Sequence, residues 1–120
     1  MAKSPIKPRV SKEAVFDLLD IRIGKVISLE LDPDSPKKAY RMQIDFGKYG
    51  MKTSVGRFTQ HTPEELKGAL VLGVLNFEPR KVGETLSEVL ILGVQYPKAE
   101  SGEATPLTCM EETKLGSKVF

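Results

Sequence analysis

The chain has 120 residues, of which 40% are hydrophobic and 28% are charged. This length fits one domain with a substantial core and leaves no room for a catalytic domain beside a separate binding domain. No apolar run approaches the roughly 18 residues that cross a bilayer, and residues 1–10 lack the apolar centre of a secretory signal. We therefore expect a cytoplasmic protein with no membrane insertion.

Cys109 is the only cysteine and His61 is the only histidine. A disulfide within one chain is therefore impossible, and a zinc site built from several Cys or His ligands is excluded. A single histidine also leaves few ways to activate a nucleophile or to build a general base. The sequence predicts a non-enzymatic protein with no catalytic residue, no metal site and no cofactor.

The net charge of +2 is unevenly distributed. Residues 1–12 contain four cations and no acid, so the remainder of the chain is mildly acidic. Pro5 and Pro8 favour an extended backbone in this segment. We expect residues 1–12 to form a basic, flexible tail and residues 13–120 to form a single domain. The tail suits contact with phosphates and equally suits a solubilising terminus.

The first half of the chain predicts a short helix followed by strands. Residues 11–19 fit a helix with Ser11 as its N-cap and Val15, Leu18 and Leu19 on one apolar face. A long strand is expected over residues 20–31, with Gly24 marking a bulge or bend. The Asp, Pro and Ser residues at 32–36 favour a chain reversal. Alternation of apolar and polar residues over 40–46 then predicts a strand with one buried face.

The second half predicts further strands and one helix. After a strand near residues 51–55, residues 62–66 fit a short helix with Thr62 as its N-cap. The apolar runs at 69–77 and 89–94 are typical of central strands buried on both sides, and a last strand is expected near 105–110. Five or six short strands with two small flanking helices predict a mainly β chain folded as a Greek-key barrel.

Polar and basic residues gather at 76–88, between the two apolar runs. Pro79 stiffens this segment, and Arg80 and Lys81 follow it, so two cations are expected near the end of a strand. The phosphate backbone of a nucleic acid can dock on such a pair. A solvated hairpin with ordinary surface charge is the alternative.

Four motifs, taken in order, resemble the tRNA-binding-domain family, the OB-fold module also appended to methionyl- and phenylalanyl-tRNA synthetases. They are FDLLDIRIGKV at 16–26, TPEELKG at 62–68, NFEPRK at 76–81 and SEVL at 87–90. The resemblance implies a five-stranded OB-fold Greek-key barrel, a homodimer, and a basic surface that binds structured tRNA. Within the family, the chain looks most similar to the CsaA-type export-related chaperones. That similarity implies an alternative or additional function, the holding of unfolded precursor polypeptides.

In the synthetase-appended relatives, the binding loop carries a Lys-x-Arg pattern and a later Ser-x-x-Met pattern. Lys81 and Ser87 match these patterns, whereas Gly83 stands in place of the second Arg and Leu90 in place of the Met. Arg80 offers a compensating cation one position before Lys81.

The resemblance assigns roles to six residues of a candidate RNA-binding surface. Arg80, Lys81 and Ser87 are expected to face phosphates, Asn76 and Glu88 to hold the loop geometry, and Arg57 to assist. Aromatic residues make up only 7% of the chain, and tryptophan is absent. We therefore expect recognition of RNA by its shape and phosphates rather than by stacking of single-stranded bases.

Overall fold

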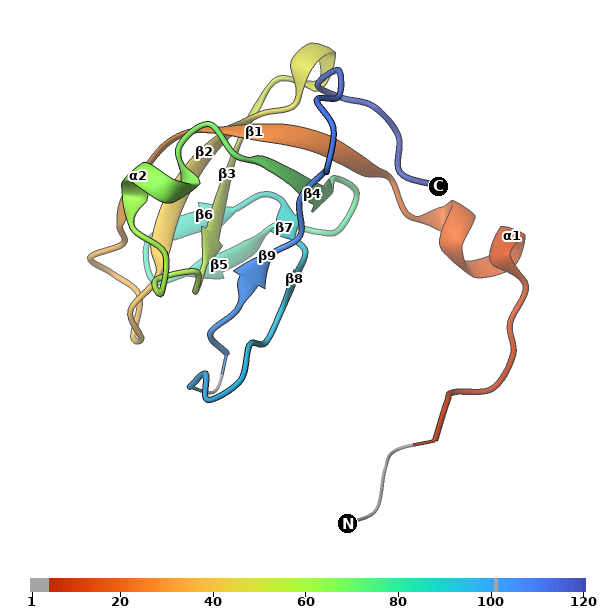
Figure 1. Ribbon diagram of the computed structural model, residues 1–120, viewed down its shortest axis with the longest axis horizontal. Helices are drawn as coiled ribbons and strands as arrows, with labels where there is room; N and C mark the ends of the chain where they lie inside the picture. Colours follow the sequence, from red (N-terminus) through yellow and green to blue (C-terminus); the bar gives the residue numbers. More distant parts are fainter. Residues whose placement is uncertain (1–4, 101) are drawn as a thin grey trace.

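The computed structural model describes residues 5–100 and 102–120. Its main antiparallel sheet has the strand order β3-β2-β1-β4-β7. These strands are β1 (Ile21–Leu31), β2 (Tyr40–Asp45), β3 (Met51–Gly56), β4 (Leu70–Val74) and β7 (Leu90–Ile91). Two small sheets pair β5 (Arg80–Val82) with β6 (Thr85–Ser87), and β8 (Gly93–Val94) with β9 (Thr105–Pro106). The main sheet curls into a nearly closed barrel (Figure 1), which confirms the predicted mainly β, OB-fold-like architecture.

Strand β1 is long enough to pair with two different strands, β4 and β2, along its length. Its residues 21–25 pair with β4, and its residues 25–31 pair with β2. The register shifts between Val26 and Ser28, so the irregularity predicted at Gly24 falls slightly later in the strand. A bulge increases local twist and bends a strand, which allows β1 to curve around the barrel.

The barrel closes where the segment after β6 meets β3. The Glu88 amide donates to the carbonyl oxygen of Thr53 at 2.8 Å, and the Glu88 carboxylate accepts from the Thr53 amide at 2.9 Å. The Ser54 hydroxyl adds a bond by donating to the carbonyl oxygen of Val89 at 2.8 Å. Side chains as well as backbone therefore complete this seam.

Phe46, directly after β2, lies in the core and is fully buried. Its ring packs against two glycines, because a Cβ atom at Gly24 or Gly73 would lie 2.7 Å or 2.6 Å from it. The alternation predicted for residues 40–46 is confirmed, since alternate side chains of β2 point into this core. The core cluster comprises Val26, Tyr40, Met42, Ile44, Phe46, Phe58, Leu66, Val71, Val89 and Ile91.

The apolar run at 89–94 is not a central strand buried on both sides, as its composition predicted. Val89 and Ile91 are buried, but Leu90 and Val94 are 48% and 51% exposed. The reason is that a barrel wall has one interior face, so alternate residues of the run point outward. The predicted strand at 105–110 likewise shortens to β9.

The helices are short and lie at the periphery. The predicted helix at 11–19 forms as α1 (Lys12–Val15) and the 3₁₀ helix η1 (Phe16–Leu18), and it stands apart from the barrel (Figure 1). The Ser11 hydroxyl caps α1 by accepting from the Ala14 amide. A second 3₁₀ helix, η2 (Gly47–Tyr49), follows β2, and α2 (Pro63–Leu66) lies between β3 and β4. Within the described ranges, no helix has the length and hydropathy needed to cross a membrane.

The predicted basic tail is described only in part. Residues 5–11 have no regular secondary structure and are exposed. Residues 1–4 lie outside the described residues. Whether the tail is flexible therefore stays a prediction.

Residues 116–119 pair with the start of β1 on the edge opposite β4. The Gly116 amide donates to the carbonyl oxygen of Ile23 at 2.7 Å, and the Ile23 amide donates to the carbonyl oxygen of Ser117 at 3.0 Å. The Val119 amide donates to the carbonyl oxygen of Ile21 at 2.9 Å. This late segment therefore extends the sheet beside the first strand.

Candidate nucleic-acid interface

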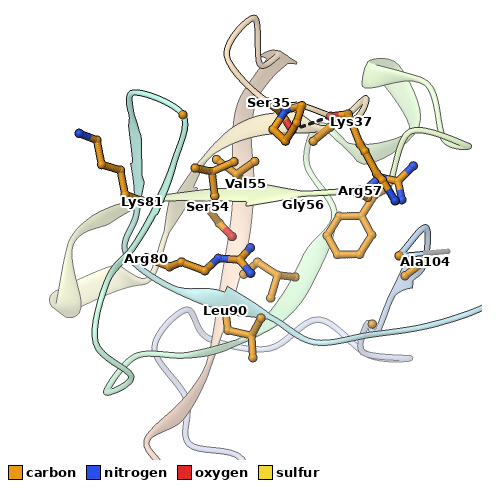
Figure 2. A pocket seen from close by; sticks show the side chains of 18 of the residues that line it. Ser35, Lys37, Ser54, Val55, Gly56, Arg57, Arg80, Lys81, Leu90 and Ala104 are labelled. Carbon is orange, nitrogen blue, oxygen red and sulfur yellow. Dashed lines mark hydrogen bonds between the residues drawn. The ribbon is translucent and has the colours of Figure 1, made fainter.

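An open groove of about 730 Å³ is lined by residues of β3 and β7, next to the seam that Glu88 and Val89 form with β3. The end of β3 and residues 90–93 form its floor, and the β5–β6 hairpin and residues 35–39 form its two walls (Figure 2). None of its described lining residues is acidic, whereas four are cationic: Lys37, Arg57, Arg80 and Lys81. Positive walls over a partly apolar floor favour an anionic ligand.

Arg80 and Lys81 are neighbours on β5 and are both exposed. In Figure 2, Arg80 reaches into the groove above Leu90, whereas Lys81 extends outward from the hairpin. Among the described residues, neither side chain makes a hydrogen bond or an ion pair, and the same holds for the side chain of Lys37 on the facing wall. These three cations are available to a ligand.

Arg57, at the other end of the groove, is already engaged. Its guanidinium lies 3.5 Å from the Glu103 carboxylate and 3.9 Å from that of Glu100, and its Nε donates to the carbonyl oxygen of Lys38 at 3.2 Å. Glu103 also accepts a 2.6 Å hydrogen bond from the Tyr96 hydroxyl, which raises the pKa of Tyr96. Only 17% of the Arg57 side chain is exposed. The two carboxylates beside it partly neutralise the positive charge at this end of the groove.

Ser87 lies on β6 opposite Arg80 and is 8% exposed. Its hydroxyl accepts a hydrogen bond from the Val55 amide at 3.1 Å. Glu88 follows directly and bonds β3 through Thr53, as described above. These two predicted site residues therefore hold the floor of the groove to the hairpin.

Asn76 lies outside the groove, at the start of the segment that leads to β5. Its side-chain oxygen accepts from the Asp20 amide at 2.7 Å, and its side-chain nitrogen donates to the carbonyl oxygen of Leu18 at 2.8 Å. Both bonds reach residues more than 50 positions away in the sequence. Asn76 thus anchors this segment to the beginning of β1.

Sequence reasoning missed Lys37 as a residue of the candidate site. It follows the turn at 32–36, and only the folded barrel brings it opposite the hairpin. The one local signal is the adjacent pair Lys37 and Lys38 directly after Pro36. Such a pair carries no information about which surface it faces.

The described residues contain no cluster of three or more His, Cys, Asp or Glu side chains that could hold a metal ion. His61 Nε2 lies 2.9 Å from the Thr105 hydroxyl, and its Nδ1 lies 3.6 Å from the Glu65 carboxylate. Because both ring nitrogens have these neighbours, the histidine is not paired with Ser87. The cations that line the groove can bind an anionic ligand.

Comparisons with known proteins agree with this geometry. Residues 21–118 match the family model described as "Putative tRNA binding domain". The chain is 34% identical to the methionine–tRNA ligase of Pyrococcus horikoshii over 87% of its own length, but it spans only 14% of that enzyme. The matched part is thus a small fraction of the ligase.

Solved structures resemble the whole barrel. The chaperone CsaA from Bacillus anthracis str. Ames superposes with a TM-score of 0.83 at 36% identity, covering 93% of this chain and 100% of that one. The CsaA chaperone of Picrophilus torridus gives a TM-score of 0.82 at 27% identity, with the same coverage of both chains. From the family match over most of its length, the chain belongs to the tRNA-binding domain family, and it resembles CsaA in its fold.

Proposed function

We propose that this protein is a non-catalytic, homodimeric tRNA-binding module of CsaA type, and that its cationic groove takes the phosphate backbone of structured tRNA. The observation that carries the proposal is the set of unpaired cations, Lys37, Arg80 and Lys81, on a groove with no acidic lining residue among those described. The family match and the similarity to a methionine–tRNA ligase support the same class of ligand.

The two walls suggest how the backbone is held. Lys37 and Arg80 line the groove on two different segments, so a phosphodiester strand lying in the groove can contact both cations. Such contacts fix position and give affinity without reading the sequence. Lys37 also lines a neighbouring hollow with Glu100 and Glu103. Arg57 contributes less to this attraction, because Glu100 and Glu103 already neutralise it. In the proposal, Ser87, Asn76 and Glu88 keep the hairpin and the floor in place.

The homodimer is proposed from exposed apolar side chains near the start of the chain. Ile6, Val10, Val15 and Leu18 are 99%, 70%, 48% and 69% exposed. These four residues recur along a segment that stands apart from the barrel, and exposed apolar side chains of this kind suit packing on a partner. Light scattering is expected to give twice the chain mass of 13.3 kDa, and a single-chain mass at micromolar concentration would contradict this part of the proposal.

The second candidate function is the holding of unfolded precursor polypeptides. The floor of the groove favours it, because Leu90 is 48% exposed there beside Val55, and the most similar architectures include CsaA chaperones. An extended peptide with apolar and acidic side chains would suit an apolar floor between cationic walls. Both functions would then use one groove.

The decisive experiment compares Arg80→Ala/Lys81→Ala with a control of equal charge change, Lys67→Ala/Lys114→Ala, whose two lysines are exposed and lie outside the groove. Each lost phosphate contact lowers the slope of log affinity against log salt by about 1. Binding to folded tRNA should therefore become weaker and less dependent on salt in the groove variant, and should keep its slope in the control. Unchanged slope and affinity in a stably folded groove variant would exclude this surface. Wild-type binding to an unfolded precursor but not to tRNA would favour the second function.

A further inference from the structure

A second hollow, of about 220 Å³, adjoins the groove and shares Val55, Arg80 and Leu90 with it. Its remaining lining residues are Phe77, Glu78, Ser87, Glu88 and Val89. Pockets for drug-sized ligands usually measure about 300–1,000 Å³, so this one suits a single planar ring or one side chain. Whatever occupies it lies directly beside the ligand of the groove.

Phe77 supplies an aromatic ring that is 46% exposed and yet held in place. The residue before it, Asn76, is bonded to both Leu18 and Asp20, and Pro79 restricts the backbone just after it. An exposed ring on an anchored segment loses little conformational freedom when a ligand packs on it. This ring is therefore prepared for stacking.

The polar residues of the hollow select the kind of ring. Glu78 and Glu88 both line it, so a phosphate there would be repelled. A carboxylate does accept hydrogen bonds from the exocyclic amino groups of nucleobases, as it does from the amino group of cytosine. Arg80 stands between this hollow and the groove, where it can meet the phosphate that precedes or follows such a base.

We propose that this hollow binds one unpaired nucleobase that carries an exocyclic amino group, stacked on Phe77, while the adjoining phosphates lie in the groove. The inference rests on the proposed tRNA-binding function and adds a base-recognition site to it. The apolar side chain of a peptide would also fit the volume, but it would offer no hydrogen-bond donor to Glu78, whereas Glu88 already accepts one from the Thr53 amide. A base fills the hollow and supplies the donor.

A single aromatic ring can stack on a single base. The site therefore agrees with the low aromatic content of the chain, which is too small for stacking along a single strand. The groove would bind the backbone of a folded RNA, and the hollow would take a single nucleotide at an end or a bulge. The protein would then discriminate between RNAs of the same shape by one unpaired position.

The test uses RNA hairpins with one identical stem that end blunt, in a single 3′ cytidine, or in a single 3′ uridine. Stacking of one base on an aromatic side chain strengthens binding by about 5-fold or more. The wild-type protein should gain about this factor from the cytidine and less from the uridine. Phe77→Ala and Phe77→Leu should both lose the gain and keep the affinity for the blunt hairpin.

Leu86→Ala is the matched control, because Leu86 is 51% exposed and lines neither hollow. It should keep the gain from the cytidine. Glu78→Gln should bring the affinities of the cytidine and uridine hairpins closer together, since a neutral amide can donate to uracil as well as accept from cytosine.

Three outcomes would overturn the inference, and they differ in what they imply for the function. Salt-dependent binding of the blunt hairpin with no gain from any overhang removes the base site and leaves the proposed function standing. Failure of the wild type to bind any hairpin or tRNA removes both. If Phe77→Ala weakens the holding of an unfolded polypeptide but not the gain from cytidine, the hollow belongs to peptide side chains.

Discussion

Gly83, in the turn between β5 and β6, packs directly on Asp34: a Cβ atom at Gly83 would lie 2.5 Å from both the Cβ atom and the carbonyl oxygen of Asp34. The contact continues beside it, where the Thr85 hydroxyl lies 3.5 Å from Oδ1 of the buried Asp32. The same Oδ1 accepts from the Asp34 amide at 3.1 Å. One wall of the groove is thereby fixed against the loop that leads into the other wall.

Gly83→Ala should therefore displace the hairpin as well as strain its turn. The φ angle of Gly83 is +59°, in a region that favours glycine, and the added methyl group would clash with backbone that cannot easily move. Gly68→Ala is the matched control, because its φ is +88° but no atom lies within 4 Å of the added Cβ.

Each substitution should cost about 1 kcal/mol for the backbone conformation alone, and Gly83→Ala should cost clearly more. Thermal unfolding measures the difference, since about 1 kcal/mol shifts the Tm of a small domain by several degrees. Equal shifts of Tm for the two variants would mean that the hairpin moves to accommodate the methyl group without loss of stability.

Ser87→Ala should lower stability, because its hydroxyl is the acceptor for the Val55 amide and the residue is buried. An amide left without a partner costs about 1–3 kcal/mol. Ser28→Ala, at an exposed position of β1, should change stability by less than about 0.5 kcal/mol. The free energy of unfolding in urea gives both values.

The same Ser87 variant tests its predicted place on the RNA-facing surface. A hydroxyl that accepts from one group can still donate to another, so a bond to a phosphate oxygen is compatible with the bond from Val55. Binding to tRNA should be measured below the unfolding range of the variant. An unchanged affinity would remove Ser87 from the candidate contacts.

The cap of α2 should weaken in acid. The hydrogen bond from the Thr62 backbone amide, with a smaller contribution from His61, holds the pKa of Glu65 below its ordinary value of 4.5. Because the folded-state pKa lies below the unfolded one, the bond stabilises the protein above about pH 4.5 and is lost as the pH falls through the folded-state value. The Thr62 amide resonance should follow this titration.

Glu65→Gln should remove the acid transition of the Thr62 amide while keeping a side-chain acceptor, since glutamine also serves in a capping box. Glu64→Gln, on the same exposed turn, should leave the transition in place. A Thr62 resonance that titrates identically in the wild type and in Glu65→Gln would show that another group controls it.

Val119→Pro should destabilise the barrel more than Lys118→Pro. Proline at 119 removes the amide that donates to the carbonyl oxygen of Ile21. The Lys118 amide takes part neither in that bond nor in the bond between the Ile23 amide and the Ser117 carbonyl oxygen. The midpoint of urea unfolding compares the two variants. Equal midpoints would mean that this edge pairing adds nothing to stability.

The elements that sequence predicted best are those with local causes. The alternation in β2, the Thr62 cap and the Ser11 cap each depend on residues within a few positions of one another. The run at 89–94 misled because a continuous apolar segment does not reveal whether one or both faces are covered. That question is decided by strands elsewhere in the chain.

The residues of the candidate site also differ in whether local sequence reveals their role. Arg80 and Lys81 were recognisable because they are adjacent and follow a proline. The partners of the other residues are distant: Ser87 bonds to Val55 across 32 positions, and Asn76 bonds to Leu18 across 58. No local pattern encodes such partners, so only the folded barrel distinguishes a residue that anchors the site from one that is available to a ligand.

The pairing of residues 116–119 with β1 has a consequence for how the chain is made. The guanidinium of Arg22 bonds to Gly116, 94 positions later. At a synthesis rate of about 5–20 residues per second, the edge of β1 near Arg22 stays uncovered for about 5–20 s after it is made. An uncovered strand edge is a template for pairing with other chains. Newly made copies on one messenger are therefore exposed to intermolecular strand pairing until this late segment emerges from the ribosome.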